Sequence, residues 1–430
     1  MTQSSRPLTP DACGPLFAEL MRYDRVAVAV SGGPDSLALL SLLQRWTESQ
    51  GQGPAITVLT VDHGLRPESA AEAETVARIA DEMGLPHETL RWEAGRPDVS
   101  GLQARARQAR YDLLAACCHE KGIPALLTAH HLDDQAETFL MRLARGSGLD
   151  GLAAIPAQGD WAGIAIHRPL LDVPKARLIA TAEAAGLAFT EDASNRDPRF
   201  ERVRLRGETE ALGALGLTPE AIALAAKRLS RARAALDRAT ETFLSESADL
   251  SRAGSAEIDL KALLAAPEEI SLRALQRLIA MAGGRQEPLR LAKLEVLLQE
   301  LREIPLKTRT LGGCRLAPVG ERLAIARETR RRGIPDMTLM PGQKALWDNR
   351  FLVSLEGAAA APVTVRPLGE EAAQAVKDLP WLRSVPRWAR ASLPSCWRNQ
   401  ALLSVSCQGL EPETARRDAK FSARFVHALD

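Results

Sequence analysis

The chain has 430 residues, more than one hydrophobic core usually organises, and its hydrophobic content of 46% is ordinary for a globular protein, so we expect two or three domains. The 55 lysines and arginines nearly balance the 54 aspartates and glutamates, so the overall charge indicates neither a nucleic-acid nor a membrane partner, and any basic surface must be local. Six scattered cysteines without a C-x-x-C pair, no export signal and no apolar run of about 18 residues predict a cytoplasmic protein with no membrane partner.

The first two hundred residues alternate short apolar runs with helical patterns, which is typical of a parallel sheet with crossover helices. Each apolar run ends at polar residues, and open α/β sheets bind ligands at the carboxyl ends of their strands. We therefore predict an α/β, Rossmann-like catalytic domain over residues 1–210. Its strands are predicted at residues 25–30 (RVAVAV), 56–61 (ITVLTV) and 125–129 (ALLTA). Its helices are predicted at residues 37–46, 69–83, 102–121, 133–145 and 175–185.

After this domain the composition shifts to Ala, Leu and Arg, and residues 218–246 predict one or two long amphipathic helices. We expect a mostly helical domain over residues 211–335 and a small mixed α+β domain over residues 336–430. The stretch 271–335 is basic. It fits a surface that binds a polyanion such as RNA, and equally a solvated helix face followed by an Arg-rich linker at residues 330–332.

A glycine-rich loop from Ser31 to Ser36 (SGGPDS) follows the first predicted strand and opens a helix. Backbone N–H groups and the helix N-terminus converge there on a space that fits a phosphate. Gly32 and Gly33 permit close backbone approach, Pro34 is tolerated at a helix start, and the two serines offer hydroxyl donors. A plain strand-turn-helix with a serine cap is the alternative, but the full string in this context favours phosphate binding.

The loop is not a Walker A sequence, because no Gly-Lys-Ser/Thr ends it and no lysine in it reaches toward a γ-phosphate. Asp35 occupies that region instead. A carboxylate repels a polyphosphate unless a cation lies between them, so Asp35 implies a Mg²⁺ ion that binds together with the nucleotide.

With this loop the sequence resembles the N-type ATP pyrophosphatases, in which S-G-G-x-D-S follows the first strand. Within them it is most similar to the tRNA(Ile)-lysidine synthetases, and the resemblance covers residues 26–206. It implies a fold of the adenine nucleotide alpha hydrolase type and cleavage of ATP between its α- and β-phosphates. The further strings that carry it occur in the family's order: VDHGLR (61–66), QARARQARY (103–111), HHLDDQAET (130–138), GSGL (146–149), RPLL (168–171) and EDASN (191–195).

The resemblance also implies a reaction and its substrates. The wobble cytidine of tRNA(Ile) with a CAU anticodon is adenylated at its C2 oxygen with release of pyrophosphate. The ε-amine of free L-lysine then attacks C2 and displaces AMP. The implied protein is a ligase that forms a C–N bond, as a monomer or homodimer.

Asp62 and His63 end the second predicted strand, one crossover from the phosphate loop. By resemblance they lie near the adenine and ribose of ATP and bind the nucleotide partly through the backbone. A surface turn closed by Gly64 is the alternative, and the neighbouring motifs favour nucleotide binding.

Asp134 and Glu137 are three residues apart at a predicted helix start, so both carboxylates share one face of the helix. With His131 they have the pattern of a metal site. Since Asp35 already implies a cation, we predict that Asp35 and Asp134 bind Mg²⁺ and that His131 and Glu137 act with them in catalysis. Capping of the helix by its first acidic residues is the alternative.

Arginines at positions 105, 107 and 110 follow one predicted helix, and a guanidinium group can stabilise the charge that develops at the α-phosphate during adenylyl transfer. We predict that role for Arg110, and a solvated charged face is the alternative reading of this helix. By resemblance Arg202, Arg204 and Arg206 belong to an arginine pattern that approaches ATP and RNA, with Arg202 and Arg204 as the predicted tRNA contacts, although Val203 stands where the family often has asparagine.

Two other functions stay open at this point. One is a tRNA thiolase with the same ATP loop, which generally needs suitably spaced cysteines, whereas Cys117 and Cys118 are adjacent in an apolar stretch and resemble core residues. The other is a non-catalytic relative that binds ATP and RNA. The intact acids Asp35, Asp134 and Glu137 argue against it.

Overall fold

The computed structural model describes residues 6–9, 12–64, 69–92, 102–189, 199, 201–303, 306–329, 333–356, 361–407 and 421–426. By their contacts they divide into two compact units, Met1–Arg233 and Ala234–Asp430. Arg66, the string at residues 191–195 and the Arg-rich linker expected at residues 330–332 lie outside the described residues.

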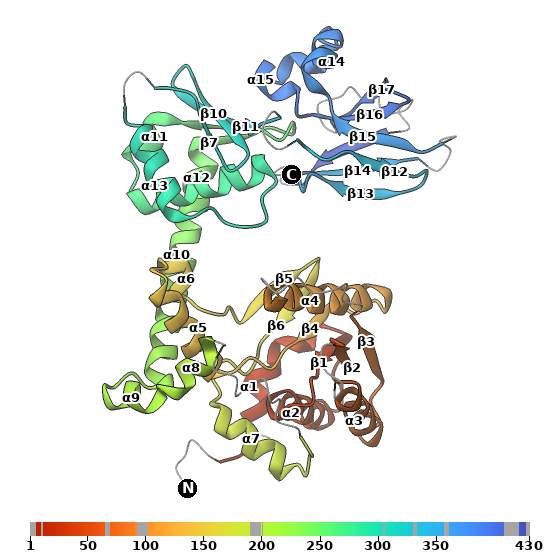
Figure 1. Cartoon of the computed structure of the whole chain (residues 1–430), viewed down its shortest axis with the longest axis vertical. Helices are drawn as coiled ribbons and strands as arrows, with labels where there is room; N and C mark the ends of the chain where they lie inside the picture. Colours follow the sequence, from red (N-terminus) through yellow and green to blue (C-terminus); the bar gives the residue numbers. More distant parts are fainter. Residues whose placement is uncertain are drawn as a thin grey trace. The chain divides into compact units, whose positions relative to one another are not determined.

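The first unit is built on a six-stranded sheet with the strand order β3-β2-β1-β4-β6-β5 (Figure 1). Five of the strands run parallel, and β5 pairs antiparallel with β6. The predicted Rossmann-like class and the three predicted strands are confirmed, whereas β3, β5 and β6 are too short or too polar to stand out in the sequence. The strands are β1 (Arg25–Ala29), β2 (Ala55–Asp62), β3 (His87–Arg91), β4 (Ala125–Leu127), β5 (Gln158–Trp161) and β6 (Ile164–His167).

Helices pack on both faces of this sheet. The helices α1 (Cys13–Phe17), α2 (Pro34–Gln50), α3 (Ser69–Glu82) and α7 (Lys175–Ala184) share one hydrophobic core with it, and α4 (Leu102–Glu120) covers the other face. In β1, Val26 and Val28 lie in the first core and Ala27 in the second, as the two-residue period of a strand requires. The remaining helices are η3 (Ala18–Arg22), α5 (Leu132–Ala144), α6 (Leu149–Leu152), α8 (Glu201–Gly207), α9 (Thr209–Ala214) and α10 (Pro219–Ser247), which continues into the second unit.

The strand order places β1 beside β4, although β2 and β3 lie between them in the sequence. From β1 the chain moves outward to β2 and β3, and β4 then begins on the opposite side. Open α/β sheets bind ligands at such a switch point, outside the carboxyl ends of the strands. The phosphate loop follows β1 and the histidine-acid string follows β4, so the topology brings these two predicted motifs together.

The second unit contains a five-stranded antiparallel sheet of order β7-β8-β11-β10-β9, which shares a hydrophobic core with the helices between β8 and β9 and with the end of α10. Helices fill much of residues 211–335, as expected, but this sheet among them has no counterpart in the prediction. Its strands have three to six residues and an Ala- and Leu-rich composition, which does not separate them from helix. The elements are β7 (Ala248–Leu250), β8 (Ala256–Asp259), α11 (Leu260–Ala265), α12 (Glu268–Gly283), α13 (Leu291–Glu300), β9 (Arg309–Leu311), β10 (Cys314–Val319) and β11 (Arg322–Arg327).

The rest of the second unit is a mixed α+β region, as predicted, with two more antiparallel sheets, β12-β15-β16-β17 and β13-β14-β18. Across the residues that can be described, no helix is long and apolar enough to cross a membrane. The elements are β12 (Met337–Leu339), β13 (Lys344–Trp347), β14 (Phe351–Leu355), β15 (Val363–Pro367), α14 (Gly369–Ala375), η5 (Pro380–Ser384), α15 (Arg387–Arg390), β16 (Pro394–Arg398), β17 (Ala401–Val405) and β18 (Phe421–Phe425).

Candidate active site

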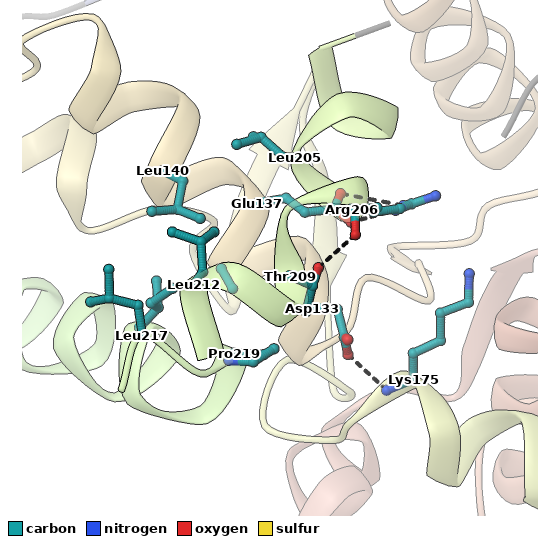
Figure 2. A pocket seen from close by; sticks show the side chains of 12 residues that line it. Asp133, Glu137, Leu140, Lys175, Leu205, Arg206, Thr209, Leu212, Leu217 and Pro219 are labelled. Atoms are coloured by element: carbon teal, nitrogen blue, oxygen red, sulfur yellow. Dashed lines mark hydrogen bonds and ion pairs between the residues drawn. The ribbon is translucent and has the colours of Figure 1, made fainter. Parts of the chain in front are cut away.

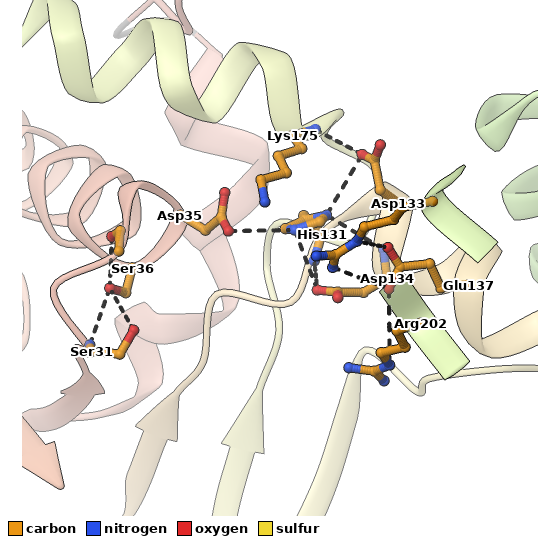
Figure 3. A network of polar contacts seen from close by, with 11 residues as sticks. Ser31, Asp35, Ser36, His131, Asp133, Asp134, Glu137, Lys175 and Arg202 are labelled. Carbon is orange, nitrogen blue, oxygen red and sulfur yellow. Dashed lines mark hydrogen bonds and ion pairs between the residues drawn. The ribbon is translucent and has the colours of Figure 1, made fainter. Parts of the chain in front are cut away.

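The loop that joins β1 to α2 keeps its shape through short hydrogen bonds of its own (Figure 3). The Ser31 N–H donates to Ser36 Oγ (N···O 3.1 Å), and the Ser36 hydroxyl donates to the Gly33 carbonyl (O···O 3.0 Å). Gly32 has a φ of +81°, which favours glycine, and Gly33 is the N-cap of α2, with Pro34 first in the helix. Because these bonds occupy Ser36, the loop offers a phosphate mainly the backbone N–H groups at the start of α2.

Asp35, in the first turn of α2, faces the start of α5 (Figure 3). Its Oδ2 lies 3.5 Å from His131 Nε2, and Asp134 Oδ2 lies 3.5 Å from the same nitrogen. Asp35 Oδ1 is buried, and no described residue forms a hydrogen bond with it. Three predicted site residues from two separate motifs thus form one cluster at the switch point.

His131 is buried at the N-cap of α5, where its backbone N–H donates to Asp134 Oδ2 (N···O 3.1 Å). Burial opposes a charge on the imidazole, but the carboxylates of Asp133 and Asp35 outweigh burial and raise the pKa of His131 to about 10. A doubly protonated ring cannot accept from the Asp134 N–H, so the 3.4 Å contact with Nδ1 is a close approach rather than a hydrogen bond. His131 is therefore a cation among three carboxylates. Asp134 belongs to this cluster and also caps the start of α5, because its carboxylate accepts from the His131 backbone N–H.

Asp133 and Lys175, neither of them predicted, extend the cluster. Asp133 Oδ2 accepts from the Lys175 N–H (N···O 2.8 Å) and lies 3.6 Å from His131 Nδ1. Burial acts to raise the pKa of Asp133, but these two contacts outweigh it and hold that pKa below its usual value. The Lys175 side chain extends toward Asp35 (Figure 3). Because Asp133 and Lys175 are 42 residues apart, no local sequence pattern could have paired them.

Glu137 is buried one turn farther along α5, and arginines of α8 bind its carboxylate. Arg206 Nε donates to Oε1 (2.5 Å) and Nη2 to Oε2 (3.3 Å), and Arg202 Nε lies 3.9 Å from Oε2. Burial acts to lower the pKa of Arg206, and the bond to Glu137 outweighs it and raises that pKa. Arg204 is exposed and donates to the Arg199 carbonyl (3.1 Å). The principal partner of Glu137 is thus Arg206, which the resemblance placed near ATP and RNA without pairing it with Glu137.

Arg110 lies on α4 in a region of positive charge. Its guanidinium carbon is 5.7 Å from the centroid of the Tyr111 ring, and that of Arg107 is 5.2 Å away. Burial lowers the pKa of Arg110. Burial and the charge of Arg168 lower the pKa of neighbouring His130 to about 2, with a further contribution from Arg107. A neutral histidine among these arginines leaves a net positive region that suits an anion.

Asp62 and His63 form a turn after β2. Asp62 Oδ1 accepts from Ser69 Oγ (2.6 Å) and from the Gly64 N–H (2.9 Å), and these bonds lower the pKa of Asp62. The ring of His63 meets that of Trp92 edge-on, with centroids 6.1 Å apart. The Asp62 carboxylate is therefore used to shape the turn, which leaves the backbone as the part of this residue that can contact a nucleotide.

A cavity of about 140 Å³ adjoins the cluster, among α5, α8, α9 and the start of α10 (Figure 2). One side of it is charged, with Asp133, Glu137, Lys175 and Arg206. The other side is apolar, so the cavity suits a ligand that has both charged groups and methylene groups. The apolar lining includes Leu140, Leu205, Leu212, Leu217 and Ile222.

The described residues of this cluster provide only part of a metal-binding site. Among the residues with described positions, no group of three or more His, Cys, Asp and Glu side chains is arranged to hold one. The unpartnered Asp35 Oδ1 and the Asp134 carboxylate fit Mg²⁺, which often binds through one or two carboxylates and completes its shell with phosphate oxygens and water. The residues therefore fit a metal–nucleotide complex rather than a permanently bound ion.

In the first unit, the first strand of a parallel sheet leads through an S-G-G-x-D-S loop into a helix, and an acidic cluster faces this loop at the switch point. This arrangement defines a PP-loop enzyme that uses ATP. Residues 12–210 match the PP-loop domain family. The chain is 45% identical over 333 residues to the tRNA(Ile)-lysidine synthase of Rhodopseudomonas palustris, covering 74% of this chain and 94% of that protein. It is 37% identical over 389 residues to the enzyme of that name from Ruegeria pomeroyi, covering 90% and 89%. The chain belongs to the tRNA(Ile)-lysidine synthase family.

Among solved structures, the U34-tRNA thiolase NcsA from Methanococcus maripaludis with its [4Fe-4S] cluster has a TM-score of 0.44 and 18% identity, covering 51% of this chain and 78% of that one. This likeness is too distant to carry an argument. Cys117 and Cys118 are buried in the core under α4, and burial raises the pKa of Cys118 to about 12, which disfavours the thiolate that sulfur transfer requires.

Proposed function

We propose that the chain adenylates the C2 oxygen of the wobble cytidine of tRNA(Ile) with a CAU anticodon and then joins lysine to C2, releasing pyrophosphate and AMP. The observation that supports this best is the meeting of the phosphate loop with the Asp35–His131–Asp134 cluster in a member of the lysidine synthase family. The substrates are ATP, this tRNA and free L-lysine. We propose the cytoplasm as its compartment and a monomer or homodimer as its active form.

In the first step the cytidine oxygen attacks the α-phosphorus, and the electron pair of the broken bond stays on pyrophosphate. Backbone N–H groups at the start of α2 bind the phosphates, and His131 positions the carboxylates of Asp35 and Asp134. Those two carboxylates would hold Mg²⁺, which neutralises phosphate charge when bound. Arg110, in its positive region, stabilises the charge that develops at the α-phosphate.

In the second step the ε-amine of lysine gives its electron pair to C2, AMP leaves with the pair of the broken C–O bond, and the amine loses a proton. Glu137, oriented by Arg206, lies on the charged side of the cavity, whose apolar side suits the methylene chain of lysine. We assign Glu137 to orienting the amine. Arg202, beside Glu137, and the exposed Arg204 are assigned to the tRNA backbone.

The test supplies the full chain with ATP, Mg²⁺, radiolabelled lysine and total tRNA. We expect lysine to enter RNA in a form that resists mild alkali, which removes lysine esterified to a tRNA end. Asp134→Asn should abolish lysine-dependent formation of AMP, and the exposed Glu183→Gln in α7 should retain it. Incorporation of sulfur in place of lysine would favour the thiolase. Binding of ATP and RNA without either product would favour the non-catalytic relative.

A further inference from the structure

Lys175 begins α7 at the edge of the candidate active site. Its backbone N–H donates to Asp133 Oδ2 (N···O 2.8 Å), which fixes the start of α7 beside the first turn of α5. Farther along α7, Leu178 and Ala182 lie in the same core as the leucines of α2, so α7 packs against the helix that the phosphate loop opens. The half-buried Lys175 side chain extends from this position toward Asp35 (Figure 3).

Lys175 is a cation near the phosphate loop that is not paired with a carboxylate among the described residues. The loop itself, residues 31–36, contains no cation and one carboxylate. Arg206, which also borders the site, is bound to Glu137 through two hydrogen bonds. In the part of the chain that the structure describes, the Lys175 ammonium takes part in no ion pair. The Lys175 ammonium, whose side chain extends toward Asp35 (Figure 3), is therefore available to a phosphate group bound at the loop.

We propose that Lys175 binds the β- and γ-phosphates of ATP and stabilises the pyrophosphate as it leaves, an inference that rests on the proposed function for the nucleotide and the bond that breaks. When the bond from the α-phosphorus to the bridging oxygen breaks, its electron pair remains on the pyrophosphate, whose negative charge increases. An ammonium group offers that charge three N–H donors and one positive charge. Lys175 thus supplies from α7 the cation that the loop lacks, while Arg110 on α4 is left to the α-phosphate.

The test compares the binding of three ligands by the full chain with Mg²⁺ present: ATP, inorganic pyrophosphate and AMP. Lys175→Met should weaken ATP and pyrophosphate by about 10- to 100-fold, the effect of losing a charged hydrogen bond, and leave AMP within about twofold because AMP lacks the β- and γ-phosphates. Lys175→Arg should restore much of the affinity for pyrophosphate. Arg177→Met, which removes a cation from the same helix, should leave all three affinities unchanged, because Arg177 donates to the Arg6 carbonyl.

Equal weakening of pyrophosphate and AMP would mean that Lys175 only supports the fold of the site, and would overturn the inference. Unchanged affinities in Lys175→Met would overturn it too, as would a raised KM for lysine with unchanged pyrophosphate binding, which would place the ammonium at the carboxylate of lysine. If Lys175→Met does not fold, Lys175→Gln replaces it in the same titrations. These measurements need neither tRNA nor lysine transfer, so failure of the proposed function, seen as absence of lysine in RNA, is a separate result.

Discussion

Gly32 holds a φ of +81°, a region in which the Cβ of an L-residue crowds its own backbone at a cost of about 1–2 kcal/mol. Its neighbour Gly33 has a φ of −78°, and a Cβ there would meet Ser31 Oγ at 3.8 Å, an ordinary contact. We therefore expect Gly32→Ala to lower the free energy of unfolding by about 1 kcal/mol after the gain from a stiffer unfolded chain, and Gly33→Ala to be neutral or slightly stabilising. Urea denaturation of the two variants measures the difference. Equal losses would show that the φ of Gly32 is not what requires glycine in this loop.

At the residue scale, the sequence identifies site residues that lie in contiguous strings, but it does not show which residues of other helices contact them. Asp35, His131 and Asp134 could be predicted because each sits at a fixed position in a motif at the end of a strand, and parallel strands bring such ends together. Arg206 and Lys175 reach the same cluster from helices 69 and 42 residues beyond their α5 partners. Only tertiary packing sets those distances, so no spacing rule could have paired them.

At the scale of elements, α8 is attached to α5 through the bond between Arg206 and Glu137. Removing the charge of Glu137 weakens a hydrogen-bonded ion pair that is largely shielded from water, since the Glu137 side chain is 9% exposed. We expect Glu137→Gln to cost about 1–2 kcal/mol, with Arg206 partly solvated, and to speed hydrogen exchange in the amides of α8. Mass spectrometry of exchanged peptides measures this change.

The matched control is Glu201→Gln, which removes another ion pair of α8. Its partner is Arg145, and the two side chains are 33% and 61% exposed, so water already screens the interaction. We expect a cost below about 1 kcal/mol and little change in exchange. If both variants loosened α8 equally, the burial of Glu137 would not be what holds the helix.

The sequence predicts those helices and strands whose apolar pattern extends over enough residues to show a helix or strand period. Five helices of the first unit begin and end within four residues of their predicted positions. β3 (HETLR) has one apolar residue in the middle of polar ones, since it lies at an edge of the sheet. The five-stranded sheet of the second unit was missed for a different reason. Its strands become strands only through pairing with one another, and their composition is also that of a helix.

At the scale of the whole molecule, arginines of the basic stretch at residues 271–335 form ion pairs with acidic residues of the same chain, most of which lie outside the stretch. Neither the polyanion-binding interpretation nor the solvated-face interpretation of this stretch predicts these ion pairs. The acidic partners lie in other segments, or at positions that the sequence suggests are exposed to solvent. These pairs offset part of the positive charge that a polyanion would meet. They are Arg273 and Arg277 with Asp237, Arg302 with Glu268, Arg309 with Glu300, Arg322 with Asp249, and Arg327 with Asp348.

One of these pairs joins the two halves of the second unit. Asp348 lies between β13 and β14, and its carboxylate accepts from Arg327 of β11 (3.0 Å to each oxygen) and from Arg350 (2.7 Å), whose side chain is fully buried. Asparagine tolerates the φ of +51° at this position, so Asp348→Asn changes the charge and little else. Leaving a buried cation without its carboxylate costs about 3–5 kcal/mol. We expect calorimetry on the full chain to show the unfolding of the second unit at a clearly lower temperature.

Asp336→Asn is the matched control for this variant, because Asp336 is an exposed carboxylate of the same unit, and its unfolding temperature should match that of the unmodified chain. The loop and acidic cluster that we propose as the ATP site belong wholly to the first unit, so Asp348→Asn should bind ATP as the unmodified chain does at temperatures where both units are folded. Reduced ATP affinity under those conditions would mean that the stability of the second unit is coupled to the nucleotide site. An unchanged unfolding temperature would mean that Arg327 and Arg350 find other partners, and that the Asp348 carboxylate is not what ties β11 to β14.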